Sequence, residues 1–150
     1  MNTEKDYKKT VTIDTDIALV YIAITKEINE WWGTNDGNAS DIHNIFKIKF
    51  SGESYWKFKI IDLVENESVV WKCIESNQDH NIKGMDEEWL NSTIIWNLSK
   101  REEGCIVIFQ HNGLKPSGVC YDACATAWDF YLVDSLKNYL ETGIGKPNMM

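Results

Sequence analysis

The residue types best suited to acid–base or thiol chemistry gather in the C-terminal third of the chain. His111 ends a stretch of alternating apolar and polar residues, and Asp122 and Cys124 follow at the start of a helical pattern. A histidine beside an acid or a thiol is the minimal material for general acid–base catalysis. Because no nucleophile motif or third partner accompanies them, we predict no catalytic residue and expect His111 to orient a ligand or to form a structural hydrogen bond.

Two further groups have the chemistry of metal ligands but not the spacing. Cys120 and Cys124 lie four residues apart, yet zinc takes four ligands and the sequence holds no second pair such as Cys-x-x-Cys. The acidic run Asp86-Glu87-Glu88 lacks the alternating acids and the glycine of a calcium loop. We therefore expect neither a metal nor a cofactor.

Tryptophan is unusually abundant, with seven in 150 residues. An indole ring offers a broad apolar surface and one N–H donor, which suits a hydrophobic ligand that carries an oxygen. We predict a ligand site lined from the strands and the last helix, although the same residues would also make an ordinary core. The predicted lining residues are Phe46, Trp56, Phe58, Trp71, Trp96, Phe109, His111, Cys124, Trp128 and Tyr131.

The charge balance bears on partners and compartment. With 23 acidic and 15 basic residues the net charge is -8, so nucleic acid and anionic membranes are disfavoured as partners.

The first residues contain no apolar stretch typical of a signal peptide, and no later run approaches the length of a membrane span. The four cysteines fall within apolar patterns, as buried free thiols do in a reducing compartment. We expect a cytoplasmic protein without disulfides.

Hydrophobic periodicity predicts an α+β fold in a single domain over residues 1–150. A helix, or equally two short helices, is expected over residues 17–32, followed by a turn-rich loop over 33–40 and, later, a loop or short helix over 77–90. Short connectors between the strands predict an antiparallel meander. The expected strands cover residues 8–13, 43–50, 54–64, 68–75, 92–100 and 105–111.

Residues 119–142 show the strongest helical pattern, and Gly143 is expected to end that helix. The apolar face in its first half contains the small residues Cys120, Ala123, Cys124 and Ala127, whereas the second half contains the larger Trp128, Tyr131 and Tyr139. This asymmetry leaves room for a ligand, or else it lets the helix approach the sheet closely. The pattern predicts that the last helix lies across the sheet.

Several segments resemble a known family. Thr93-Ile94-Ile95-Trp96, residues 107–114 (Val-Ile-Phe-Gln-His-Asn-Gly-Leu) and residues 135–143 (Ser-Leu-Lys-Asn-Tyr-Leu-Glu-Thr-Gly) resemble the START-like (SRPBCC) superfamily. Within it, the chain is most similar to the branch homologous to the C-terminal domain of the activator of heat-shock protein 90 ATPase. The resemblance covers nearly the whole chain and implies a helix-grip (START-like or Bet v 1-like) fold, a curved antiparallel sheet wrapped around a long C-terminal helix.

Three functions are compatible with that resemblance. The preferred one is binding of a small hydrophobic ligand in a cavity of about a few hundred cubic ångströms between the sheet and the helix, which a solidly packed interior would contradict. A protein-interaction module that regulates a chaperone is the first alternative, marked by an exposed apolar patch. The second is a cyclase-like or hydrolase-like enzyme that uses the same cavity. A protein partner or a homodimer is expected besides the ligand.

Overall fold

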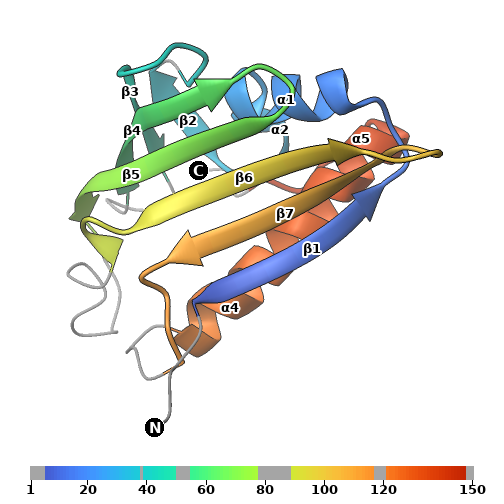
Figure 1. Ribbon diagram of the computed structural model, residues 1–150. Coiled ribbons are helices and arrows are strands. Elements are labelled where there is room, and N and C mark those ends of the chain that lie inside the picture. The colour runs from blue at the N-terminus through green and yellow to red at the C-terminus, as the bar shows by residue number, and fades with distance from the viewer. Residues whose placement is uncertain (1–5, 38, 50–54, 78–88, 117–120, 148–150) are drawn as a thin grey trace, which may run out of the picture.

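Segments of alternating burial assemble into a curved antiparallel sheet, seen in the computed structural model of the protein (Figure 1). The structure describes residues 6–37, 39–49, 55–77, 89–116 and 121–147. Within these ranges the strands are β1 (Tyr7–Ile13), β2 (Thr34–Gly37), β3 (Ile45–Lys49), β4 (Tyr55–Val64), β5 (Ser68–Asn77), β6 (Thr93–Lys100) and β7 (Cys105–Asn112).

The strand order is β1-β7-β6-β5-β4-β3-β2, and each neighbouring pair is antiparallel. Strands β2 to β7 follow one another in both sequence and space, which confirms the predicted meander. Every second residue is buried, as Cys105, Val107, Phe109 and His111 are in β7. Because successive side chains of a strand point to opposite faces, the sheet has one apolar inner face and one outer face.

The prediction of a loop over residues 33–40 is wrong for β2, which pairs with β3 from Thr34 opposite Lys49 to Gly37 opposite Phe46. Asn, Asp and Gly favour turns, but pairing with an adjacent strand overrides that preference at the edge of a sheet. Gly37 adopts a φ of 122°, and a Cβ atom there would lie 2.6 Å from the Ile45 carbonyl oxygen.

Two short helices follow β1, as one of the two predicted alternatives has it. Helix α1 spans Ile17–Thr25 and α2 spans Ile28–Trp31. Asp16 caps α1, since its side chain accepts a hydrogen bond from the Ala18 amide at 2.9 Å. The indole of Trp31 donates to the Ala23 carbonyl at 2.8 Å, which fixes α2 against α1.

The C-terminal helix runs across the inner face of the sheet (Figure 1). It comprises α4 (Tyr121–Asp129), the π-helical segment η1 (Phe130–Lys137) and α5 (Asn138–Thr142). Gly143 ends it with a φ of 88° and donates its amide to the Tyr139 carbonyl at 2.8 Å, as predicted. None of the helices within the described ranges is long and apolar enough to cross a membrane.

The buried seam of this helix is narrower than the predicted apolar face. Cys124, Trp128, Leu132 and Leu136 are buried, whereas Ala123 and Ala127 are exposed. Of the small residues expected on the inner face, Cys124 is buried, Ala123 and Ala127 are not, and Cys120 lies outside the described residues. The buried residues are spaced four positions apart, so they lie on one side of the helix. Ala123 and Ala127 each precede a buried residue by one position and therefore lie beside the seam.

The second half of the helix is anchored to α2 through a buried serine. Ser135 donates its hydroxyl proton to the Trp31 carbonyl at 2.6 Å and accepts a hydrogen bond from the Lys146 amide at 2.7 Å. A Cβ atom on Gly145 would lie 1.9 Å from the Glu30 carbonyl oxygen. The residues after the helix therefore pack closely on α2.

Candidate functional site

The residues predicted to line a site lie together between the sheet and the last helix. All are buried except Tyr131, which is partly buried. Phe46, Trp56 and Phe58 come from β3 and β4, and the helix contributes Cys124, Trp128 and Tyr131. Trp71, Trp96, Phe109 and His111 come from β5, β6 and β7. Inward alternation on five adjacent strands brings residues distant in sequence to one face.

Trp32, which was not among the predicted lining residues, lies at the centre of this cluster. Its ring stacks on Trp71, with centroids 5.8 Å apart and planes 5° apart, and its centroid lies 5.0 Å from that of Trp128. It also stacks on Trp31 at 5.9 Å. The Trp31-Trp32 pair in the sequence was the only signal, because the short helix α2 gives no pattern that assigns a side chain to the interior.

The rings of the cluster are in direct contact. The centroid of Trp96 lies 4.8 Å from that of Phe109 and 5.5 Å from that of Trp71, and the centroid of Trp128 lies 4.5 Å from that of Phe109. Centroid separations of about 4.5–7 Å are those of contacting aromatic side chains. A ligand that enters between these rings must therefore push at least one of them aside, so these rings do not form the open cavity expected from the sequence.

The indole N–H groups of the cluster fall into two classes. Trp31 donates to the Ala23 carbonyl, Trp89 donates to Cys124 Sγ at 3.3 Å, and Trp128 donates to His111 Nδ1 at 3.2 Å. In contrast, the buried Nε1 atoms of Trp71 and Trp96 have no hydrogen-bond partner within the described ranges. A buried donor without an acceptor costs about 1–3 kcal/mol, so these two groups are unusual in a folded core.

His111 forms part of a directional hydrogen-bond chain. Because an indole only donates, Nδ1 of His111 must accept from Trp128, and we assign the ring proton to Nε2. That Nε2–H then donates to Ser92 Oγ at 2.9 Å, and the Ser92 hydroxyl donates to the Trp89 carbonyl at 2.5 Å. Burial lowers the pKa of His111 from 6.5 to about 3, and a weaker attraction from Asp6 opposes the shift.

This chain runs in the wrong direction for a nucleophile and its base. A serine activated by histidine donates its proton to the imidazole, whereas Ser92 accepts from the imidazole and donates to a backbone carbonyl. Both nitrogens of His111 are engaged, by Ser92 and Trp128. His111 therefore joins β7 to the residue before β6 and to the last helix, which is the structural one of the two roles expected from the sequence.

The described cysteines Cys73, Cys105 and Cys124 are buried. Burial raises the pKa of Cys73 to about 12, so its thiol is protonated at neutral pH and is a poor nucleophile. Cys120, the other member of the predicted pair, lies outside the described residues. Among those residues no three histidine, cysteine or acidic side chains cluster as metal ligands do.

Comparisons with known proteins agree with this architecture. Residues 14–141 match the family described as Activator of Hsp90 ATPase homolog 1-like protein. None of the curated proteins matches the chain significantly.

Among solved structures, the Aha1 dimer from Colwellia psychrerythraea is 26% identical, with a TM-score of 0.76 over 93% of this chain and 98% of that chain. Protein MLL2253 from Mesorhizobium loti is 17% identical, with a TM-score of 0.75 over 91% of this chain and 96% of that chain. Protein SSP2350 from Staphylococcus saprophyticus is 15% identical, with a TM-score of 0.72 over 96% and 98% of the two chains. The last two likenesses show the helix-grip fold, and the match over residues 14–141 shows that the chain belongs to the family of Activator of Hsp90 ATPase homolog 1-like proteins, within the START-like superfamily.

Proposed function

We propose that the protein binds one small, largely apolar molecule between the inner face of β5 and β6 and the last helix. The observation that supports this proposal is the pair of buried indole donors of Trp71 and Trp96, for which no acceptor exists in the described part of the chain. The centroids of the two rings lie 5.5 Å apart, and we propose that one oxygen-bearing ligand bonds to both donors. Phe46, Phe58 and Phe109 add apolar surface, and both ring nitrogens of His111 are already hydrogen-bonded.

The energetics favour a ligand that carries an acceptor. Each unpaired donor costs the free protein about 1–3 kcal/mol, and a ligand carbonyl or hydroxyl oxygen placed against it recovers that cost. The face of a neighbouring aromatic ring is a much weaker substitute. A hydrocarbon of the same shape gains only the apolar contact, so the site selects for flat molecules with an oxygen at one edge.

Entry to this site requires movement of a ring. Trp32 stacks on Trp71 and follows the short helix α2, so a change of its side-chain rotamer exposes the face of the Trp71 ring. We propose that Trp32 is the side chain that moves to admit the ligand. The bound ligand then takes the place of the Trp32 ring against Trp71.

Indole N–H resonances in nuclear magnetic resonance spectra test the proposal directly. Titration with coumarin, flavone and 1,4-naphthoquinone, with naphthalene as the acceptor-free control, is expected to move the Trp71 and Trp96 indole protons downfield. The Trp31 indole keeps its bond to the Ala23 carbonyl and should therefore shift less than those of Trp71 and Trp96. Trp71→Phe and Trp96→Phe variants assign the resonances. If naphthalene binds as well as the oxygen-bearing compounds, the donors play no role in recognition.

Regulation of a chaperone is the second candidate, because the family is described by activation of the Hsp90 ATPase. We propose that this activity uses an outer surface of the protein and survives the Trp71→Phe substitution. The measurement is the stimulation of the ATPase rate of Hsp90 from the same organism.

The Colwellia protein is a dimer, which supports a homodimer here too. Light scattering measures the oligomeric state. The buried cysteines support a location in the cytoplasm, where reducing conditions keep thiols from forming disulfides.

A further inference from the structure

The outer face of β3, β4 and β5 is basic in an acidic protein. These strands contain five lysines against the two acids Asp62 and Glu75, a net charge of +3, whereas the whole chain carries -8. The lysines alternate with buried inward residues, so they share the outer face. They are Lys47 and Lys49 in β3, Lys57 and Lys59 in β4, and Lys72 in β5, and are called the lysine face below.

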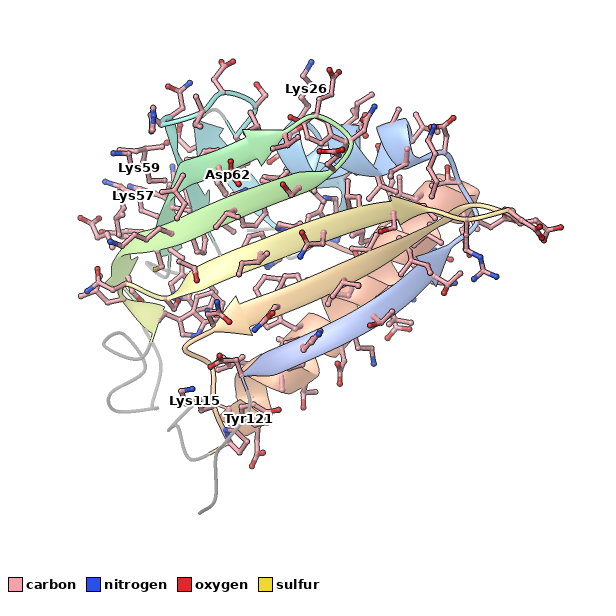
Figure 2. The ribbon with its side chains drawn as sticks, in the orientation of Figure 1. Lys26, Lys57, Lys59, Asp62, Lys115 and Tyr121 are labelled. Carbon is pink, nitrogen blue, oxygen red and sulfur yellow. The ribbon has the colours of Figure 1, made fainter. Side chains whose placement is uncertain are left out.

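The strand register places lysines directly opposite one another. Lys47 is the partner of Lys57, and Lys59 is the partner of Lys72. Like charges at directly opposed positions destabilise a sheet, so folding alone gains nothing from this arrangement. Figure 2 shows Lys57 and Lys59 extending from β4 into the solvent.

Only part of this charge is compensated. Lys57 forms an ion pair of 3.5 Å with Glu75, and Lys49 forms one of 3.5 Å with Asp36 of β2. Lys47 lies 4.4 Å from the ring centroid of Tyr55. Lys59 and Lys72 form no ion pair with any residue that the structure describes. A hydrogen bond from Tyr55, together with Lys57 and Lys47, lowers the pKa of Glu75, so even the acid on this face stays ionised to lower pH.

Exposed aliphatic side chains accompany the lysines. Ile45 is 47% exposed and lies opposite Lys59, and Ile61, two residues further along β4, is 38% exposed. Apolar contacts next to unpaired ammonium groups suit a segment that is itself acidic and partly apolar. A bilayer or a nucleic-acid duplex would instead bring the acidic remainder of the molecule near an extended anionic surface, where it is repelled.

We propose that the lysine face is a docking surface for an acidic, partly apolar segment of a partner protein. This proposal does not depend on the buried tryptophan site, which lies on the other face of the sheet. The partner supplies carboxylates to Lys59 and Lys72 and apolar side chains to Ile45 and Ile61. Binding relieves the repulsion between the opposed lysines.

The probe is a synthetic peptide of alternating glutamate and leucine, titrated into nitrogen-15-labelled protein at low salt. We expect amide shifts confined to β3, β4 and β5, and affinity that falls as salt screens the charges. Lys59→Glu with Lys72→Glu should weaken binding by about tenfold or more, and Lys59→Gln with Lys72→Gln by a smaller factor.

The matched control changes the same total charge elsewhere. Lys8→Glu with Lys100→Glu alters two exposed lysines outside the lysine face and should change the affinity by less than about twofold. Equal losses in both double variants, shifts outside β3 to β5, or no binding even at low salt would each overturn the proposal.

Two other occupants have their own signatures. Tight binding to phosphatidylglycerol vesicles or to a DNA duplex, lost in the Lys59→Glu, Lys72→Glu variant, would show that the face serves a membrane or nucleic acid. Self-association that the same variant abolishes would show that a second copy of the chain covers it. Either result would contradict an acidic protein partner.

Discussion

Two Trp→Phe substitutions should differ in stability although they remove the same atoms from similarly buried sites. Trp128 is 2% exposed and Trp96 is fully buried. Trp128→Phe leaves the buried Nδ1 of His111 without its donor, which costs about 1–3 kcal/mol. Trp96→Phe removes a donor that has no acceptor among the described residues, and so relieves a cost of similar size.

The space left by the smaller ring is common to both variants, so the difference between them reports the hydrogen bonds. We expect the free energy of unfolding of Trp96→Phe to exceed that of Trp128→Phe by roughly 2–6 kcal/mol. Urea unfolding of ligand-free protein, followed by circular dichroism, measures it, provided that the slopes agree.

Trp31→Phe is the control, because the Trp31 indole donates to the Ala23 carbonyl at 2.8 Å. This variant should lose about as much free energy of unfolding as Trp128→Phe. Equal stability of all three variants would refute the reasoning, since it would mean that the Trp96 N–H finds an acceptor in the free protein.

Three further predictions concern particular groups. Unfolded His111 takes a proton near pH 6.5 but the folded residue only near pH 3, so the free energy of unfolding should fall by about 2 kcal/mol from pH 7 to pH 5. The His111→Gln variant should lose this dependence on pH. An unchanged dependence would contradict the lowered pKa of His111. Ser135→Ala should cost about 1–3 kcal/mol and speed hydrogen exchange at the Lys146 amide, which a merely exposed hydroxyl would not affect. Lys72→Glu should raise the melting temperature by about 1–3 °C, because it replaces repulsion with attraction to Lys59; a decrease argues against their register.

Most of the fold could be predicted from the strand periodicity of the sequence. Inward residues such as Phe58, Trp71 and Phe109 could be assigned because the side-chain period of a strand is two, and all are fully buried. Strand β2 could not, because its Thr-Asn-Asp-Gly sequence favours turns and only pairing with β3 makes it a strand.

The polar contacts of the interior were beyond prediction for a different reason. The chain from Trp128 through His111 and Ser92 to Trp89 joins residues distant in sequence, and its direction follows from atomic positions. The π-helical segment Phe130–Lys137 likewise has apolar spacing that an ordinary α-helix would share. Sequence periodicity locates faces, whereas the partners across an interface depend on packing.

Native mass spectrometry of the protein purified from its own organism tests the central claim most directly. We expect a stoichiometric small molecule to survive on the folded protein and to be released on denaturation, with an oxygen acceptor on an otherwise apolar frame. Its retention should fall in the variant that carries both Trp71→Phe and Trp96→Phe. A protein that carries no ligand, and whose tryptophan fluorescence stays unchanged across lipids and aromatic metabolites, would contradict the binding function.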